Sequence, residues 1–130
     1  MMNAPIPDNE ADRLQVLREL LILDTPPEER FDRIVEFAAE EFGVPIALIS
    51  LVDDNRQWFK ARFGLAVCET DRKSSFCGHA IHVSEVMVVE DATQDPASRT
   101  TPWCWAIRRS ASMRARRWRC VRACASAPCA

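Results

Sequence analysis

The sequence predicts an α+β sandwich in which helices are followed by antiparallel strands. Two helical patterns occupy the first 43 residues. Between residues 44 and 63 the periodicity changes to the apolar and alternating runs that are typical of strands. After Pro96 the composition changes sharply. Helices followed by antiparallel strands favour the α+β class.

Two amphipathic helices are predicted in the first part of the chain. The first covers residues 9–23, where leucines recur at helical spacing opposite a charged face: Leu14, Leu17, Leu20 and Leu21. The second begins at a capping box of Thr25 and Glu28, with Pro26 at the first helical position. It should end at Gly43, since Pro45 prevents continuation. Its apolar stripe consists of Phe31, Ile34, Val35, Ala38 and Phe42.

Strands follow the second helix. The run VPIALISLVDD predicts a buried strand, and a turn at Asp53–Asn55 joins it to RQWFKARFG in a hairpin. Regular alternation on the second strand puts Phe59 and Phe63 on one face and Trp58 on the other. After a polar connection, Ser74 or Ser75 can cap a short helix, FCGHAIHVS. The run VMVVED predicts a third strand.

Charge divides the chain into two parts. Residues 1–95 carry 9 Lys and Arg against 19 Asp and Glu, whereas residues 96–130 carry 8 Arg and no acid. No apolar run is long enough to span a membrane. The first residues, MMNAPIPDNEADR, are acidic and polar, which is unlike a signal peptide. A cytoplasmic protein with no membrane partner is expected.

Residues 13–96 resemble a bacterial GAF domain. The stretches that carry the resemblance are LDTPPEERFDRI, the hairpin ending in QWFK, SSFCGHAI and VMVVEDATQDP. They are similar to the subtype found at the N-terminus of sensor histidine kinases and diguanylate cyclases. The resemblance implies a GAF/PAS-like six-stranded antiparallel sheet with helices on one face and a small-molecule pocket on the other. It also implies a sensory module of bacterial signal transduction, such as a two-component system, rather than an enzyme.

The candidate ligand site combines the short helix with the second strand. Within residues 13–96, Cys77, His79 and His82 are the only cluster with reactive potential, and His79 and His82 are helical neighbours. They could line a pocket or hold a metal, or Cys77 could be a buried apolar residue and His79 a hydrogen-bonded one. No orienting third group for a catalytic Cys–His pair is evident. The candidate ligand-binding residues are Trp58, Lys60, Phe76, Cys77, His79 and His82, with no metal and no identified cofactor.

Two other interactions follow from the predicted helices and the family. The first helix could pair with its copy in a homodimer, with Leu14, Leu17 and Leu21 as the seam. Some GAF relatives reduce free methionine sulfoxide with cysteines, and others attach a bilin. Cys68 and Cys77 do not match the pattern of either group.

The last part of the chain is predicted to be an out-of-frame tail. Residues 103–106, WCWA, are encoded TGG TGY TGG GCN, and a shift of two bases gives Val-Leu-Gly whatever synonyms are used. GC-rich synonyms for the following residues then allow strings such as FYAGAPL and GTLC, which the resemblance leads one to expect after Pro96. A following Leu-Ile pair would place a stop codon after Ala130. We therefore expect a disordered N-terminus at 1–12, a partial domain at 13–96 and a tail without a native fold, irregular or spuriously helical, at 97–130.

The tail allows two other interpretations. Its arginines, with Trp118, could bind nucleic acid through phosphates and stacking, although clustered arginine is a weak signal and specific binding is not expected. These arginines are Arg108, Arg109, Arg114, Arg116, Arg117, Arg119 and Arg122. Its cysteines, Cys104, Cys120, Cys124 and Cys129, have only one pair with zinc-like spacing. A zinc site is therefore not expected.

Overall fold

The computed structural model describes residues 3–90 and 118–120. The elements are α1 (Glu10–Glu19), α2 (Glu29–Phe42), β1 (Ala47–Val52), β2 (Arg56–Phe63), β3 (Glu69–Asp71), α3 (Phe76–Ala80), β4 (Met87–Val89) and β5 (Trp118–Cys120). Strands β1, β2 and β3 form an antiparallel sheet in that order, and β4 pairs with β5. Helices with a small antiparallel sheet confirm the predicted α+β class.

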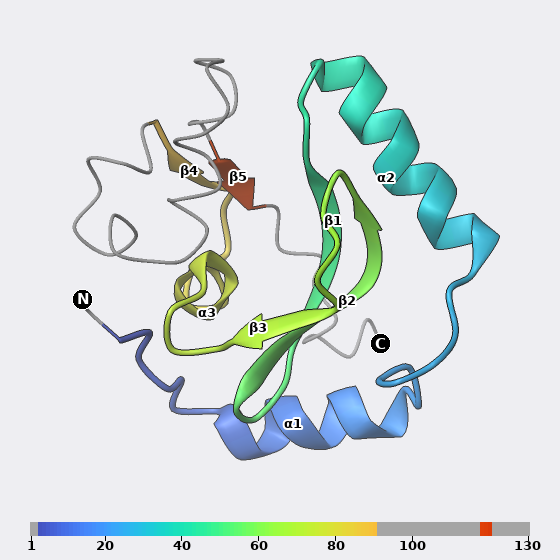
Figure 1. The fold of residues 1–130 in the computed structure, drawn as a ribbon. Helices are drawn as coiled ribbons and strands as arrows, with labels where there is room; N and C mark the ends of the chain where they lie inside the picture. Colours follow the sequence, from blue (N-terminus) through green and yellow to red (C-terminus); the bar gives the residue numbers. More distant parts are fainter. Residues whose placement is uncertain (1–2, 91–117, 121–130) are drawn as a thin grey trace.

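Helices lie on both sides of the hairpin formed by β1 and β2. Helix α2 runs along one side, α3 lies on the other, and α1 crosses below the end of the hairpin (Figure 1). The third strand of the main sheet is β3, which the sequence analysis assigned to a polar connection. The predicted third strand, VMVVED, is β4 and belongs to the smaller sheet. Its partner β5 lies in the predicted tail, so three tail residues form a strand rather than irregular or helical structure.

Helix α1 is shorter than predicted. It ends at Glu19, because Leu21 and Asp24 adopt left-handed backbone conformations with φ of 51° and 59°. Non-glycine residues rarely adopt positive φ, and a helix cannot continue through it. Leu20 and Leu21 therefore lie beyond the helix and are largely exposed.

Helix α2 begins later than the capping box predicted. Its N-cap position is Glu28 and not Thr25, and neither end of a capping box forms. The Thr25 hydroxyl donates instead to the Ile22 carbonyl at 2.6 Å. The predicted end is confirmed, since Gly43 has φ of 58° in the left-handed region.

A β-bulge in β2 changes the faces of that strand. Ile49 pairs with Ala61 but the next residue, Ser50, pairs with Phe59, so Lys60 is an extra residue without a partner on β1. A bulge interrupts alternation. Phe59 therefore shares a face with Ser50, whereas Phe63 lies on the α2 side. The prediction that Phe59 and Phe63 share one face is wrong for this reason.

The core lies between the helices and the hairpin. Its buried apolar side chains include Leu14 and Leu17 from α1, Val35 and Ala39 from α2, and Trp58, Phe59 and Ala61 from β2. Burying a large apolar side chain contributes roughly 1.5–3 kcal/mol. None of the helices in the described ranges has the length and apolar character needed to cross a membrane.

Candidate functional site

The short helix α3 is held in place by a serine cap and a glycine. Ser75 accepts a hydrogen bond from the Gly78 N–H at 2.9 Å and donates to the Arg72 carbonyl at 2.7 Å, which resolves the choice between Ser74 and Ser75. A Cβ at Gly78 would lie 2.7 Å from the Arg72 carbonyl oxygen and 2.8 Å from the Ala4 Cβ. Only glycine fits this contact, so α3 sits close to the neighbouring backbone.

Cys77 points from α3 toward the sheet. Its Sγ lies 3.1 Å from the Ser50 hydroxyl on β1, and the Gln57 amide on β2 donates to it at 3.4 Å. Ser50, Gln57 and Phe59 share this face of the hairpin by the register of the strands. We name Ser50, Gln57 and Cys77 the thiol cluster. Ser50 and Gln57 were not predicted as site residues, although they lie on the two strands of the predicted hairpin.

The two histidines have different surroundings. The Nε2 of His79 is buried and has no hydrogen-bond partner among the described residues. His82 is exposed, and its Nε2 lies 2.9 Å from the Pro5 carbonyl oxygen, so this ring ties the N-terminal segment to the end of α3. Phe76, at the start of α3, is buried. Of the predicted ligand residues, the structure thus gathers Phe76, Cys77 and His79 on α3 beside the sheet.

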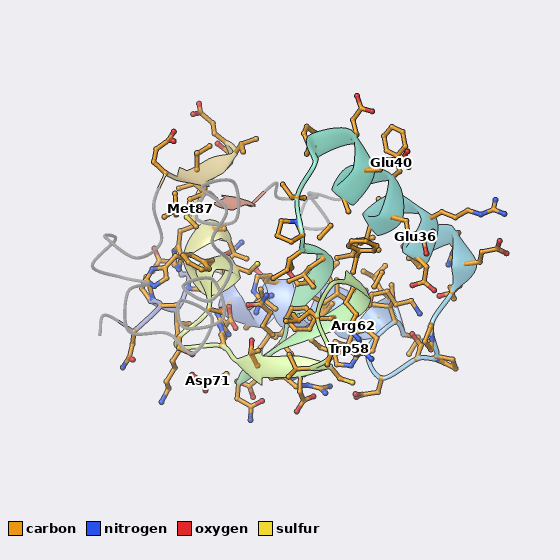
Figure 2. All side chains as sticks on the ribbon, turned by 45° about the horizontal axis from the view of Figure 1, so that its top comes forward. Glu36, Glu40, Trp58, Arg62, Asp71 and Met87 are labelled. Carbon is orange, nitrogen blue, oxygen red and sulfur yellow. The ribbon has the colours of Figure 1, made fainter. Side chains whose placement is uncertain are left out.

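Trp58 and Lys60 do not belong to this face. The register and the bulge put Trp58 on the α2 side, where it is buried. Figure 2 marks Trp58 and Arg62 on β2 and Glu36 and Glu40 on α2. The bulge explains why alternation alone could not place these side chains.

Lys60 is engaged in a structural contact. Its side chain is fully buried, and its Nζ contacts Thr25 Oγ1 at 2.7 Å, the Pro26 carbonyl oxygen at 2.8 Å and Glu28 Oε2 at 2.7 Å. Hydrogen bonding to Lys60 lowers the pKa of Glu28. A buried ammonium needs such partners, because its desolvation is costly. Lys60 therefore fixes the start of α2 to β2 and is not available to a ligand on the α3 side.

A buried ion cluster positions the segment before α3. The guanidinium of Arg72 contacts both carboxylate oxygens of Glu10 and the carbonyls of Asp53 and Asp54. Arg13 donates to the same carboxylate at 2.8 and 2.9 Å. These bonds, those from Arg13 first, lower the pKa of Glu10 to about 2 against the opposing effect of burial. No sequence pattern indicates this cluster, because Glu10 and Arg72 lie 62 residues apart.

The predicted leucine seam is not a continuous surface. Leu14 and Leu17 are buried in the core, and Leu21 lies past the end of α1 with 81% of its surface exposed. The helix ends before Leu21 because of the left-handed residues described above. Two copies could therefore contact each other through Leu21, but Leu14 and Leu17 could join the contact only if the core opened.

Two further features bear on chemistry. Within the described part of the chain, no three His, Cys, Asp or Glu side chains form a group that could hold a metal ion.

An open depression of about 600 Å³ lies on the α2 side, lined by Glu36, Ala39, Glu40, Gly43, Val44, Pro45 and Phe63. It is on the opposite side of the hairpin from the thiol cluster. Cys104, Cys124 and Cys129 of the tail, and its arginines other than Arg119, lie outside the described residues.

Comparison with known proteins points to one family. The model of the GAF domain matches residues 26–129. A cyclic di-GMP phosphodiesterase from Pseudomonas aeruginosa is 41% identical over 103 residues, which are 79% of this chain and 18% of that protein. The matched region thus spans less than a fifth of the relative's length. The family match continues beyond Pro96, where the resemblance seen in the sequence ended.

Proposed function

Because this chain belongs to the GAF domain family, we propose that it is a regulatory module of bacterial signal transduction that binds a small molecule on the α3 side of its sheet. The thiol cluster carries the proposal. Ser50, Gln57 and Cys77 come from three elements, and the Ser50 hydroxyl and the Gln57 amide both lie within hydrogen-bonding distance of the Cys77 thiol. A few convergent polar groups on an apolar wall are typical of small-molecule sites.

The surroundings of the thiol cluster support this proposal. Phe59 supplies apolar surface on the same face of the hairpin, and Phe76 is buried next to Cys77 on α3. On the same short helix, the buried Nε2 of His79 has no hydrogen-bond partner among the described residues. A ligand with an acceptor group would offer that nitrogen a hydrogen bond. The relative acts in cyclic di-GMP turnover by its name, which supports second-messenger signalling as the context. We assign no catalytic step to these residues, and the reaction of any longer protein would belong to another domain.

A ligand screen on the 130-residue chain tests the proposal. Metabolites, nucleotides and cyclic dinucleotides would be scored by thermal shift, and a ligand on the α3 side should raise the melting temperature by binding the folded state. Gln57→Leu should abolish the shift, whereas Glu40→Gln, on the far side of the sheet, should retain it. A shift that survives Gln57→Leu and is lost in Glu40→Gln would place the ligand at α2 and contradict the proposal.

A second candidate is a non-functional remnant of a signalling gene, a histidine kinase or a diguanylate cyclase. The abrupt change of charge and composition after Pro96 favours it. A remnant should bind none of the screened compounds and should unfold without a cooperative transition. A cooperative thermal transition of the purified chain would count against it. Nucleic-acid binding through the tail ranks below both, because charge alone produces non-specific binding.

A further inference from the structure

The outward side of α2 carries a row of residues that no other described element covers. Arg30, Ile34, Phe37 and Glu41 follow one another at intervals of four, three and four residues, so they share one side of the helix. Ile34 is 54% exposed and Phe37 is 66% exposed. The buried residues of α2, Val35 and Ala39, lie on the opposite side of the helix by their spacing, and we call Arg30, Ile34, Phe37 and Glu41 the α2 row.

The α2 row is complementary to itself in the antiparallel direction. Suppose that two α2 helices meet about a twofold axis that passes between Ile34 and Phe37. Ile34 of each copy then comes level with Phe37 of the other, and Arg30 comes level with Glu41 of the other. The same surface thus supplies both halves of an isologous contact, with an apolar centre and an ion pair at each end.

The helix dipole favours the same arrangement. The last turn of α2 holds Glu40 and Glu41 and no basic residue, and the first turn holds Arg30 together with the acids Glu29 and Asp32. Glu29 and Asp32 suit the macrodipole, which favours acids at the start and bases at the end, whereas Arg30, Glu40 and Glu41 oppose it. An antiparallel partner brings Arg30 to the acidic end of the other helix and Glu41 to its start. Arg30 then lies near the negative end of the partner helix dipole and Glu41 near its positive end, and both positions are favourable.

Nothing within α2 prevents this contact. Arg30 pairs with Glu28 at 3.1 Å, but its side chain is 71% exposed, and exposed pairs contribute little. Its guanidinium also lies 4.6 Å from the centre of the Phe31 ring. Both contacts leave guanidinium donors for a second carboxylate, since arginine has five.

We propose that the α2 row is the interface through which two copies of this chain form a twofold-symmetric dimer. The occupant of this surface is a second α2 helix in the antiparallel direction. The proposal does not rest on the ligand site, which lies on the other side of the sheet. This interface takes the place of the leucine seam predicted on the first helix, because Leu14 and Leu17 of that seam are buried in the core.

Sedimentation of the full chain over a concentration series tests the interface. We expect a monomer–dimer equilibrium for the unaltered protein. Arg30→Glu and Glu41→Arg should each weaken dimerisation about tenfold, because the twofold axis repeats each contact. The variant that carries both Arg30→Glu and Glu41→Arg should restore dimerisation, because the ion pair between the two copies forms again with its charges exchanged. Phe37→Glu should abolish the dimer, and circular dichroism should show an unchanged fold because Phe37 is exposed.

Leu21→Glu is the matched control. It changes an exposed leucine of the α1 region and should leave the equilibrium unchanged. A monomer at every concentration would overturn the proposal. A dimer that is lost in Leu21→Glu and retained in Phe37→Glu would also overturn it and would assign the contact to α1. Failure of the double charge reversal to recover the dimer would rule out the antiparallel pairing.

Discussion

At the scale of single residues, Lys60 determines both the faces of β2 and the attachment of the loop before α2. The ammonium is buried without exposed surface and has three oxygen partners between residues 25 and 28. Its position in a bulge frees it from the alternation of β2. The same residue therefore both shifts the faces of the strand and attaches the loop before α2 to the sheet. A substitution at this position tests both roles.

Replacing Lys60 with methionine should lower the free energy of unfolding by about 2–4 kcal/mol. The substitution keeps most of the stem but removes a buried ammonium from its three oxygen partners, of which Glu28 has 40% of its side chain exposed. Urea denaturation followed by circular dichroism measures the loss. Arg33→Met serves as the control, because its pair with Glu29 has both side chains more than 70% exposed. We expect less than about 0.5 kcal/mol for the control. Equal effects of the two variants would show that the burial of Lys60 has no energetic role.

At the scale of elements, ion clusters join segments that are distant in the chain. Glu10 on α1 binds Arg72 before α3, and Arg56 on β2 binds Asp24, Asp53 and Glu69. These carboxylates raise the pKa of Arg56 above its usual range. Helix α1 and the loop that follows it are thus attached to the hairpin by charge as well as by Leu14 and Leu17. The attachment should respond to acid.

The contribution of Glu10 to stability should depend on pH. Its folded pKa is about 2, below the ordinary value of 4.5. A carboxylate whose pKa is lower in the folded state than in the unfolded state contributes its full stabilisation at any pH above its unfolded pKa. Glu10 therefore loses this contribution as the pH falls from 4.5 toward 2. The difference in unfolding free energy between the unaltered chain and Glu10→Gln should therefore be large at pH 7 and shrink across that window. The control is Glu36→Gln on the surface of α2. A difference that stays constant with pH would contradict the assignment.

At the scale of the whole molecule, residues 97–130 have one property that separates them from the domain and two that connect them to it. Their composition differs from that of the acidic first part, but the family match reaches residue 129 and β5 pairs with β4. In the described sheet, β1 is an edge strand and many large apolar side chains are exposed. Such edges favour association with other chains. The frameshift proposed from the sequence stays a prediction.

Determining the nucleotide sequence around the codon of Pro96 tests that prediction. A single-base change that restores the other frame should extend the domain with Val-Leu-Gly at the WCWA codons, followed by strands with normal apolar alternation. Expression of the corrected gene should then give a product that unfolds cooperatively. If neither alternative frame encodes such strands, the present frame is the native one and the arginine-rich segment is part of the protein.

The sequence by itself determined the local elements of this protein. Helical spacing, the left-handed Gly43, the serine cap of α3 and the hairpin at residues 53–55 follow from neighbouring residues, and the motifs identified the family. Only the tertiary structure decided which face each side chain occupies. The bulge at Lys60 depends on partners in the loop before α2, and the left-handed turn after Glu19 shortens α1. Contacts such as Glu10–Arg72 and Cys77–Gln57 join distant positions. No local pattern records them, because they depend on how the elements pack.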